Sequence, residues 1–196
     1  MFAGHFGLAA AVKSREPEVP LWALMLSTQL LDVLFVPLFL MHIETIDPIG
    51  NGGYGQGIIH ANYTHSLIGA LVIALCAGLL AWRPWGRRGA LVIAAVVFSH
   101  WLLDLLVHRA DLPILPGNLG NLPLLGFGLW AFPLVSIILE GALITVGAIL
   151  YIRSAWSRSS SANSNRSGSH TSAIIAGVVI SLLLAFALIT DVLGVG

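Results

Sequence analysis

Residues 89–108, GALVIAAVVFSHWLLDLLVH, decide both the class of the protein and its chemistry. As a helix, this run is long enough to cross a hydrocarbon core about 30 Å thick. It nevertheless contains His100, Asp104 and His108, spaced four residues apart. That spacing places the three side chains on one helix face. Ionisable groups inside a bilayer are costly unless they are paired, hydrated or bound to a metal, so this stripe indicates a functional site.

Other stretches are also apolar and long enough to span a membrane. They are residues 20–42, 59–82, 124–151 and 173–193. Hydrophobic residues make up 57% of the 196 and charged residues 9%, against roughly 25% charged in a soluble domain. The sequence therefore predicts an all-α integral membrane bundle of about five transmembrane helices, with the lipid bilayer as its partner. A formal net charge of +0 gives no reason to expect nucleic acid.

The two ends of the chain are expected to differ from this pattern. Residues 1–12 are apolar but rise only about 18 Å as a helix, which is too short to span. We expect a re-entrant half-helix that brings His5 to Asp32, whereas an interfacial anchor would leave His5 at the cytoplasmic surface. Near the other end, a Ser/Asn-rich run is typical of a flexible linker. The predicted division is a bundle at 1–153, a linker at 154–172 and an additional transmembrane helix at 173–196.

Most basic residues lie in every second connection of the predicted spans, beginning with the segment before the first span. They are Lys13, Arg15, Arg83, Arg87, Arg88, Arg153, Arg158 and Arg166. By the positive-inside rule, the segments that carry them are cytoplasmic, whereas residues 43–58 and 109–123 face outward. This predicts a cytoplasmic N-terminus and a C-terminus outside.

Further polar residues interrupt the predicted spans. Counted at about 1.5 Å per residue, most fall in one layer near the middle of the membrane. The set is His5, Asp32, His100, Asp104 and Glu140, with His65 and His60 approaching from the outer side. Histidine nitrogens and carboxylate oxygens converging from several helices are what zinc or another divalent metal requires. A single histidine is more often a hydrogen-bonding residue between helices, but the whole set favours a metal or proton-handling site.

Several short motifs in these spans resemble one bacterial family. They are Phe2-Ala3-Gly4-His5, Gln29-Leu30-Leu31-Asp32, His60 with Tyr63-Thr64-His65-Ser66, Ser99-His100-Trp101-Leu102-Leu103-Asp104, and His108-Arg109 with Asp111-Leu112-Pro113. Over residues 1–153 the chain resembles the inner-membrane metal-dependent hydrolases that include LexA-regulated membrane proteins. That family is thought to be distantly similar to zinc-dependent phospholipase C and P1-type nucleases. The chain departs from the family pattern at Asn62, at Ala131 and beyond residue 153.

The resemblance implies a place in the bacterial inner (cytoplasmic) membrane and, by analogy, phosphoester hydrolysis. It implies metal ligation by His5, Asp32, His60, His65, His100 and Asp104, with Glu140, His108 and Asp111 around them. We therefore expect a membrane-embedded hydrolase of phosphoester or ester bonds in a lipid or small substrate, using a divalent metal, zinc in the first place. His108 or Asp111 would act as general base or orient the nucleophile.

Two other functions stay open. The C-terminal region, which lies outside the resemblance, fits a non-catalytic subunit of a larger photosynthetic or respiratory membrane complex, docked through its last helix. Alternatively, His100, Asp104, His108 and Asp111 form a ladder that could conduct protons or ions. Against this, the ladder leads to one side only, and the sequence has no internal repeat typical of transporters.

Overall fold

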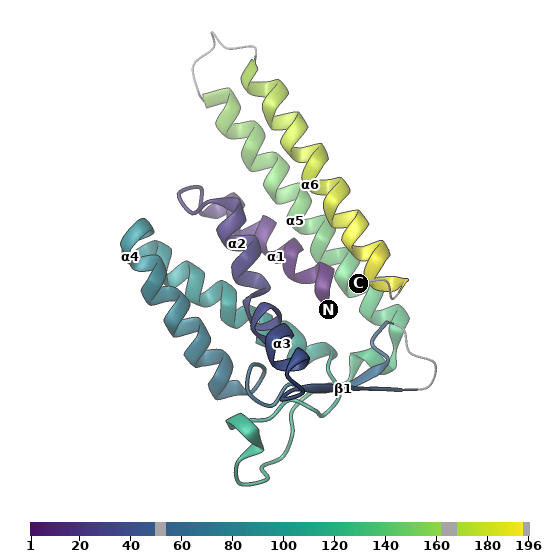
Figure 1. Cartoon of the computed structure of the whole chain (residues 1–196). Coiled ribbons are helices and arrows are strands. Elements are labelled where there is room, and N and C mark those ends of the chain that lie inside the picture. Colours follow the sequence, from purple (N-terminus) through teal and green to yellow (C-terminus); the bar gives the residue numbers. More distant parts are fainter. Residues whose placement is uncertain (50–53, 162–167, 194–196) are drawn as a thin grey trace.

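The computed structural model describes residues 1–49, 54–161 and 168–193 and is mostly helical (Figure 1). Its elements are α1 (Phe2–Arg15), α2 (Leu21–Thr28), α3 (Leu30–Leu40), β1 (Thr45–Pro48), β2 (Gly57–His60), α4 (Leu67–Val107), η1 (Pro116–Asn118), η2 (Leu129–Ala131), α5 (Pro133–Ser161) and α6 (Gly168–Val192). By length and composition, α4, α5 and α6 could each cross a membrane, and α2 with α3 makes a fourth, bent candidate. The predicted all-α class is confirmed.

The first predicted span, residues 20–42, is broken in the structure. α2 and α3 are bent by 49° with respect to each other. Gln29, between them, has φ −108° and ψ 6°, outside the helical region. Its Nε2 donates a hydrogen bond to the carbonyl of Phe2 at 3.1 Å, which ties the bend to α1. The break was not predicted because both halves are apolar and together have the length of one span.

α4 folds back on itself and forms two arms, as Figure 1 shows at the left of the view. The turn lies at Gly86, whose φ of +63° is in the left-handed region that glycine adopts without strain. The arms touch at Gly78, where an added Cβ would lie 3.0 Å from both the Ala90 carbonyl oxygen and the Ala94 Cβ. Small residues therefore allow the arms to pack closely.

α1 packs directly against the backbone of α5. A Cβ added to Gly7 would lie 2.7 Å from the carbonyl of Leu143, and one added to Gly147 would lie 2.0 Å from the Gly7 oxygen. Around this contact, the buried core of α1, α5 and α6 consists of Ala3, Ala10, Ile144, Ala148, Ile180 and Leu184. The half-helix is thus held by protein on a long helix rather than by lipid.

The C-terminal helix shares that core through Ile180 and Leu184, so α6 packs on the bundle. α5 continues beyond the predicted boundary at residue 153 and ends at Ser161. Serines of its last turns bond back to the helix, since the Ser159 and Ser160 hydroxyls donate to the Trp156 carbonyl. Residues 162–167 of the predicted linker lie outside the described residues.

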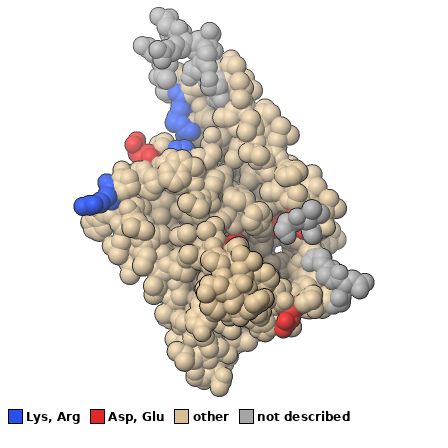
Figure 2. All heavy atoms as spheres, in the orientation of Figure 1, with Lys and Arg blue, Asp and Glu red and all other residues tan. Residues whose placement is uncertain are grey.

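The segments predicted to be cytoplasmic meet at one end of the bundle, here called the basic end. Arg88, near the turn of α4, donates to both carboxylate oxygens of Glu16 at 2.9 and 2.8 Å. Ser154 of α5 donates to the carbonyl of Ser14 in α1 at 2.9 Å. Figure 2 shows Lys and Arg gathered toward that end, while most of the visible surface is uncharged. Such a surface suits contact with lipid.

The opposite end, here called the hairpin end, carries a small antiparallel sheet. β1 and β2 pair with Thr45 opposite His60. This sheet was not predicted, because each strand has only four residues. Nearby, the loop after α4 covers the start of that helix, where the Pro113 carbonyl accepts from the Leu67 amide at 2.9 Å. These segments close the bundle at the hairpin end.

Replacing Gly147 with alanine should push α1 away from α5, because the new Cβ would lie 2.0 Å from the Gly7 oxygen. We expect a loss of about 1–3 kcal/mol in the free energy of unfolding, as for overpacked cores. Unfolding of the purified protein in detergent micelles measures it. Gly141→Ala on the same helix is the control, since its Cβ would come no nearer to a described residue than 4.0 Å, to Leu188. Equal stability of the two variants would contradict the backbone contact.

Candidate metal centre

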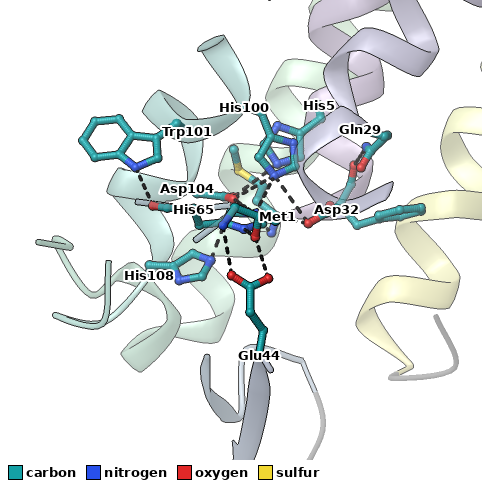
Figure 3. Close-up of polar contacts among 12 residues, drawn as sticks. Met1, His5, Gln29, Asp32, Glu44, His65, His100, Trp101, Asp104 and His108 are labelled. Carbon is teal, nitrogen blue, oxygen red and sulfur yellow. Dashed lines mark hydrogen bonds and ion pairs between the residues drawn. The ribbon is translucent and has the colours of Figure 1, made fainter. Parts of the chain in front are cut away.

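The structure gathers most of the predicted polar layer inside the bundle (Figure 3). His5 comes from α1 and Asp32 from α3, while His65 lies just before α4 and His100 and Asp104 lie on its second arm. All of these are buried except Asp32, whose side chain is 38% exposed. His5 therefore lies where a re-entrant half-helix would place it and not at the basic end.

Two carboxylate oxygens lie close to the facing Nε2 atoms of His65 and His100 in this cluster. His65 Nε2 lies 3.3 Å from His100 Nε2 and 3.3 Å from Asp32 Oδ1. Asp104 Oδ2 lies 2.9 Å from His100 Nε2 and 3.6 Å from His65 Nε2. Asp32 Oδ1 is 3.5 Å from His100 Nε2. Two ligands of a tetrahedral zinc ion with bonds of about 2.0–2.2 Å are separated by about 3.3–3.6 Å. Four of these separations fall in that range, and the 2.9 Å one is shorter.

The far side of the His100 ring shows which nitrogen carries the proton. Nδ1 lies 2.5 Å from the carbonyl oxygen of Thr28, which can only accept, so Nδ1–H donates. Thr28 is the last residue of α2, and carbonyls at a helix C-terminus have no partner within the helix. The break at Gln29 thus supplies the acceptor. In the neutral imidazole, Nε2 of His100 then has a lone pair that faces the cluster.

Glu44 similarly determines which ring nitrogen of His65 carries the proton. Its carboxylate is fully buried and accepts from the amides of Tyr63 and Thr64 at 2.7 and 2.9 Å. It also accepts from the Thr64 hydroxyl at 2.8 Å. Because that hydroxyl donates to Glu44, it accepts from Nδ1–H of His65, 2.9 Å away. In the neutral imidazole, Nε2 of His65 therefore has a lone pair as well.

Two lone pairs consequently face each other between His65 and His100, with two carboxylates beside them. Unprotonated nitrogens 3.3 Å apart cannot hydrogen-bond to each other, so a positive charge is needed between them. A proton on His100 Nε2, donated to Asp104 Oδ2 at 2.9 Å, or a metal ion would supply it, and the separations of 3.3–3.6 Å fit the metal. Histidines that bind zinc usually donate their other N–H to a carbonyl or carboxylate, as in the Thr28 contact. The residues present therefore fit a divalent metal.

His5 holds Asp104 from the other side. Its Nε2 lies 3.2 Å from Asp104 Oδ1, and its ring stacks on His100 with centroids 3.9 Å apart. This leaves Asp104 Oδ2 directed toward His65 and His100. Among the described residues, two triads have the spacing of metal ligands, His5–His100–Asp104 and Asp32–His65–His100. They share His100, whose Nε2 would bind only one ion at a time.

His108 and Asp111 lie beside the cluster, and both are buried. His108 Nδ1 lies 2.9 Å from Asp111 Oδ1, and Asp111 Oδ2 accepts from the Ile59 amide at 3.1 Å. Nε2 of His108 is 3.8 Å from Asp104 Oδ2. The indole of Trp130 packs on the His108 ring with centroids 4.3 Å apart. Asp111 therefore orients the imidazole toward the cluster.

A pocket of about 200 Å³ adjoins these groups. Its lining is polar at one side and apolar elsewhere, and consists of Met1, Phe2, Asp32, Phe35, Ile46, Ile59, His65, Asp104, His108 and Trp130. It is smaller than the roughly 300–1,000 Å³ of sites for drug-sized ligands. A phosphate or ester group fits such a volume, whereas a whole lipid does not.

Two residues predicted as ligands lie elsewhere. His60 ends β2, and its Nε2 contacts Asp47 Oδ2 at 3.0 Å with both side chains exposed. Glu140 is buried in α5, where its charge interacts with the Met1 amino group, Asp191 and Tyr54. Neither belongs to the triads found among the described residues. Depth along a helix, counted from the sequence, does not determine which neighbour a side chain faces.

Sequence analysis gave no role to Thr28, Glu44 and Thr64, which fix the two histidine rings. Glu44 lies in a polar connection between spans, where an acidic residue is normally solvated. A threonine next to a candidate ligand was the one available signal. The acceptor role of Thr28 depends on a backbone break, which side-chain patterns do not reveal.

Comparisons with family models, with curated proteins and with solved structures found no match. The family resemblance of residues 1–153 therefore stays a prediction, and the geometry of the cluster carries the functional proposal.

Proposed function

We propose that the chain is a membrane-embedded, metal-dependent hydrolase of phosphoester or ester bonds. The observation that supports it most is the facing pair of Nε2 lone pairs on His65 and His100, 3.3 Å apart. With Asp32 and Asp104 they would hold one divalent ion, and their mixture of nitrogen and oxygen ligands suits zinc. Zinc supplies Lewis acidity and activates water near neutral pH.

His108 is the general base in this proposal. It lines the pocket, and its Nδ1–H donates to Asp111, which leaves Nε2 free to take a proton. Asp111 would stabilise the imidazolium that forms, in the manner of a catalytic triad carboxylate. Both Asp111 oxygens are already engaged, by His108 and by the Ile59 amide, so Asp111 is a positioning residue.

The substrate class follows from the pocket and its surroundings. Ile46 of β1 and Ile59 of β2 line the pocket, which places it toward the hairpin end. Its volume of about 200 Å³ admits the reacting group of a lipid or a small molecule. The partly exposed Asp32 side chain is the cluster group that the substrate would meet first.

We further propose five crossings of a bacterial inner membrane. Each arm of α4 has about 20 residues, the length that spans the hydrocarbon core, and the bent pair α2–α3 makes another crossing. The basic end would face the cytoplasm by the positive-inside rule. The hairpin end, and with it the pocket, would then lie on the outer side.

Purified protein should bind about one zinc ion per chain at the cluster, and His100→Ala or Asp104→Ala should abolish this binding. Each variant removes a ligand and leaves the others with unbalanced charge. Elemental analysis after exposure to zinc and desalting measures the content. His60→Ala is the control and should keep the metal, since His60 pairs with Asp47 at the surface. A folded wild type that takes up no metal would refute the proposal.

Thr64→Val should weaken zinc binding by about 10–100-fold, as loss of an outer hydrogen bond to a ligand does. Valine keeps the shape of threonine but cannot accept from Nδ1–H of His65. Competition with a chelator of known affinity measures the change. Thr145→Val is the matched control, because that hydroxyl only bonds the Gly141 carbonyl within α5. Equal affinities in the two variants would show that Glu44 and Thr64 do not prepare His65.

His108→Ala should lower kcat by about 10²–10⁴-fold, the usual contribution of a general base, without changing the zinc content. Hydrolysis of a nitrophenyl phosphodiester, with nitrophenyl esters in parallel, provides the assay. Asp111→Asn should cause a smaller fall together with an altered pH profile, because it changes the support of the imidazole and not the base itself. Wild-type turnover in His108→Ala would remove His108 from the mechanism.

A further inference from the structure

A second group of buried polar atoms lies between α5, α6 and two connecting segments. The structure has eight buried side-chain polar atoms without a hydrogen-bond partner among the described residues. Of these, Tyr54 Oη, Trp130 Nε1, Glu140 Oε1, Glu140 Oε2 and Asp191 Oδ2 belong to this one group. Native proteins leave few such atoms unpaired, so their concentration needs a physical cause.

These atoms face one another. The Glu140 carboxylate interacts with Asp191 and with Tyr54, and the Tyr54 hydroxyl also interacts with the Trp130 indole. No pair among them meets the geometry of a direct hydrogen bond. Polar groups that converge across such gaps are normally joined by an ordered water or an ion.

The charge of the group favours an ion over water alone. Glu140 is fully buried, and Asp191 places a second carboxylate next to it. Among the described residues, the cationic group that faces Glu140 is the amino group of Met1, which also lies 3.9 Å from Asp104. Two neighbouring carboxylates in a low-dielectric interior require further positive charge.

We propose that Glu140, Asp191 and Tyr54 form a second cation site, separate from the metal centre, for a hard divalent cation such as Ca²⁺ or Mg²⁺. Oxygen ligands are those that these cations prefer, in contrast to the histidine nitrogens of the first centre. The charge of the cation balances the two carboxylates.

This site joins segments that are distant in the chain. Asp191 belongs to α6, Glu140 to α5 and Tyr54 to the connection between β1 and β2. Asp191 is only partly buried, which gives a cation access from the end of α6. Binding of the cation therefore fastens α6 to the bundle. Through Trp130, whose ring packs on His108, the cation site also adjoins the pocket.

Terbium(III) tests the site because it replaces Ca²⁺ among oxygen ligands and luminesces when a nearby indole absorbs. Zinc-loaded, full-length protein in detergent is titrated with Tb³⁺ under tryptophan excitation. We expect saturable emission that Ca²⁺ or Mg²⁺ displaces. Trp130→Phe should dim the emission, and Asp191→Asn should weaken Tb³⁺ binding at least 10-fold while zinc content is unchanged.

Matched variants separate this site from the metal centre. Asp47→Asn, an exposed carboxylate on β1, should leave the titration unchanged. His100→Ala should lose zinc but keep saturable Tb³⁺ emission, so failure of one site is distinguishable from failure of the other. Emission that is absent in wild type or unaffected by Asp191→Asn would overturn the cation site. Asp191 is half-buried, so Asp191→Asn tests the cation site even if a Glu140→Gln variant does not fold.

Discussion

The facing Nε2 atoms of His65 and His100 constrain much of the surrounding structure. Each can present a lone pair only if an acceptor behind the ring holds its Nδ1–H. For His100 the acceptor is the Thr28 carbonyl, which is available because α2 ends there. For His65 it is the Thr64 hydroxyl, whose direction the buried Glu44 determines. The bend between α2 and α3 and the buried acid near the hairpin are thus parts of the site.

Assembly of the cluster also depends on small residues between α1 and α5. His5 reaches Asp104 only because α1 approaches α5 at backbone distance, with Gly7 against Leu143. In a bilayer, helices gain little from hydrophobic contact with each other, and close backbone packing replaces that driving force. The polar cluster and the glycine contact therefore support each other.

The sequence predicted what depends on composition and on position along a helix. The helical class follows from apolar runs, and the layer of His5, Asp32, His100 and Asp104 follows from counting residues. Residue counts do not give the rotation of a side chain about the helix axis, so the neighbours of Glu140, Tyr54 and Asp191, were not predicted. The break at Gln29 and the short strand that carries His60 also escaped, because both depend on contacts with segments distant in the chain.

The contact between α1 and α5 has a consequence for the order of biogenesis. A helix of 14 residues is too short to be held across a bilayer by lipid, so its final place depends on the partner that it packs against. That partner is distant, since Ser14 bonds to Ser154 over 140 residues of chain. During synthesis α1 emerges well before this partner, which is about 140 residues further along the chain. His5 can therefore join the cluster only after α5 has been made, which makes assembly of this centre a late step of folding.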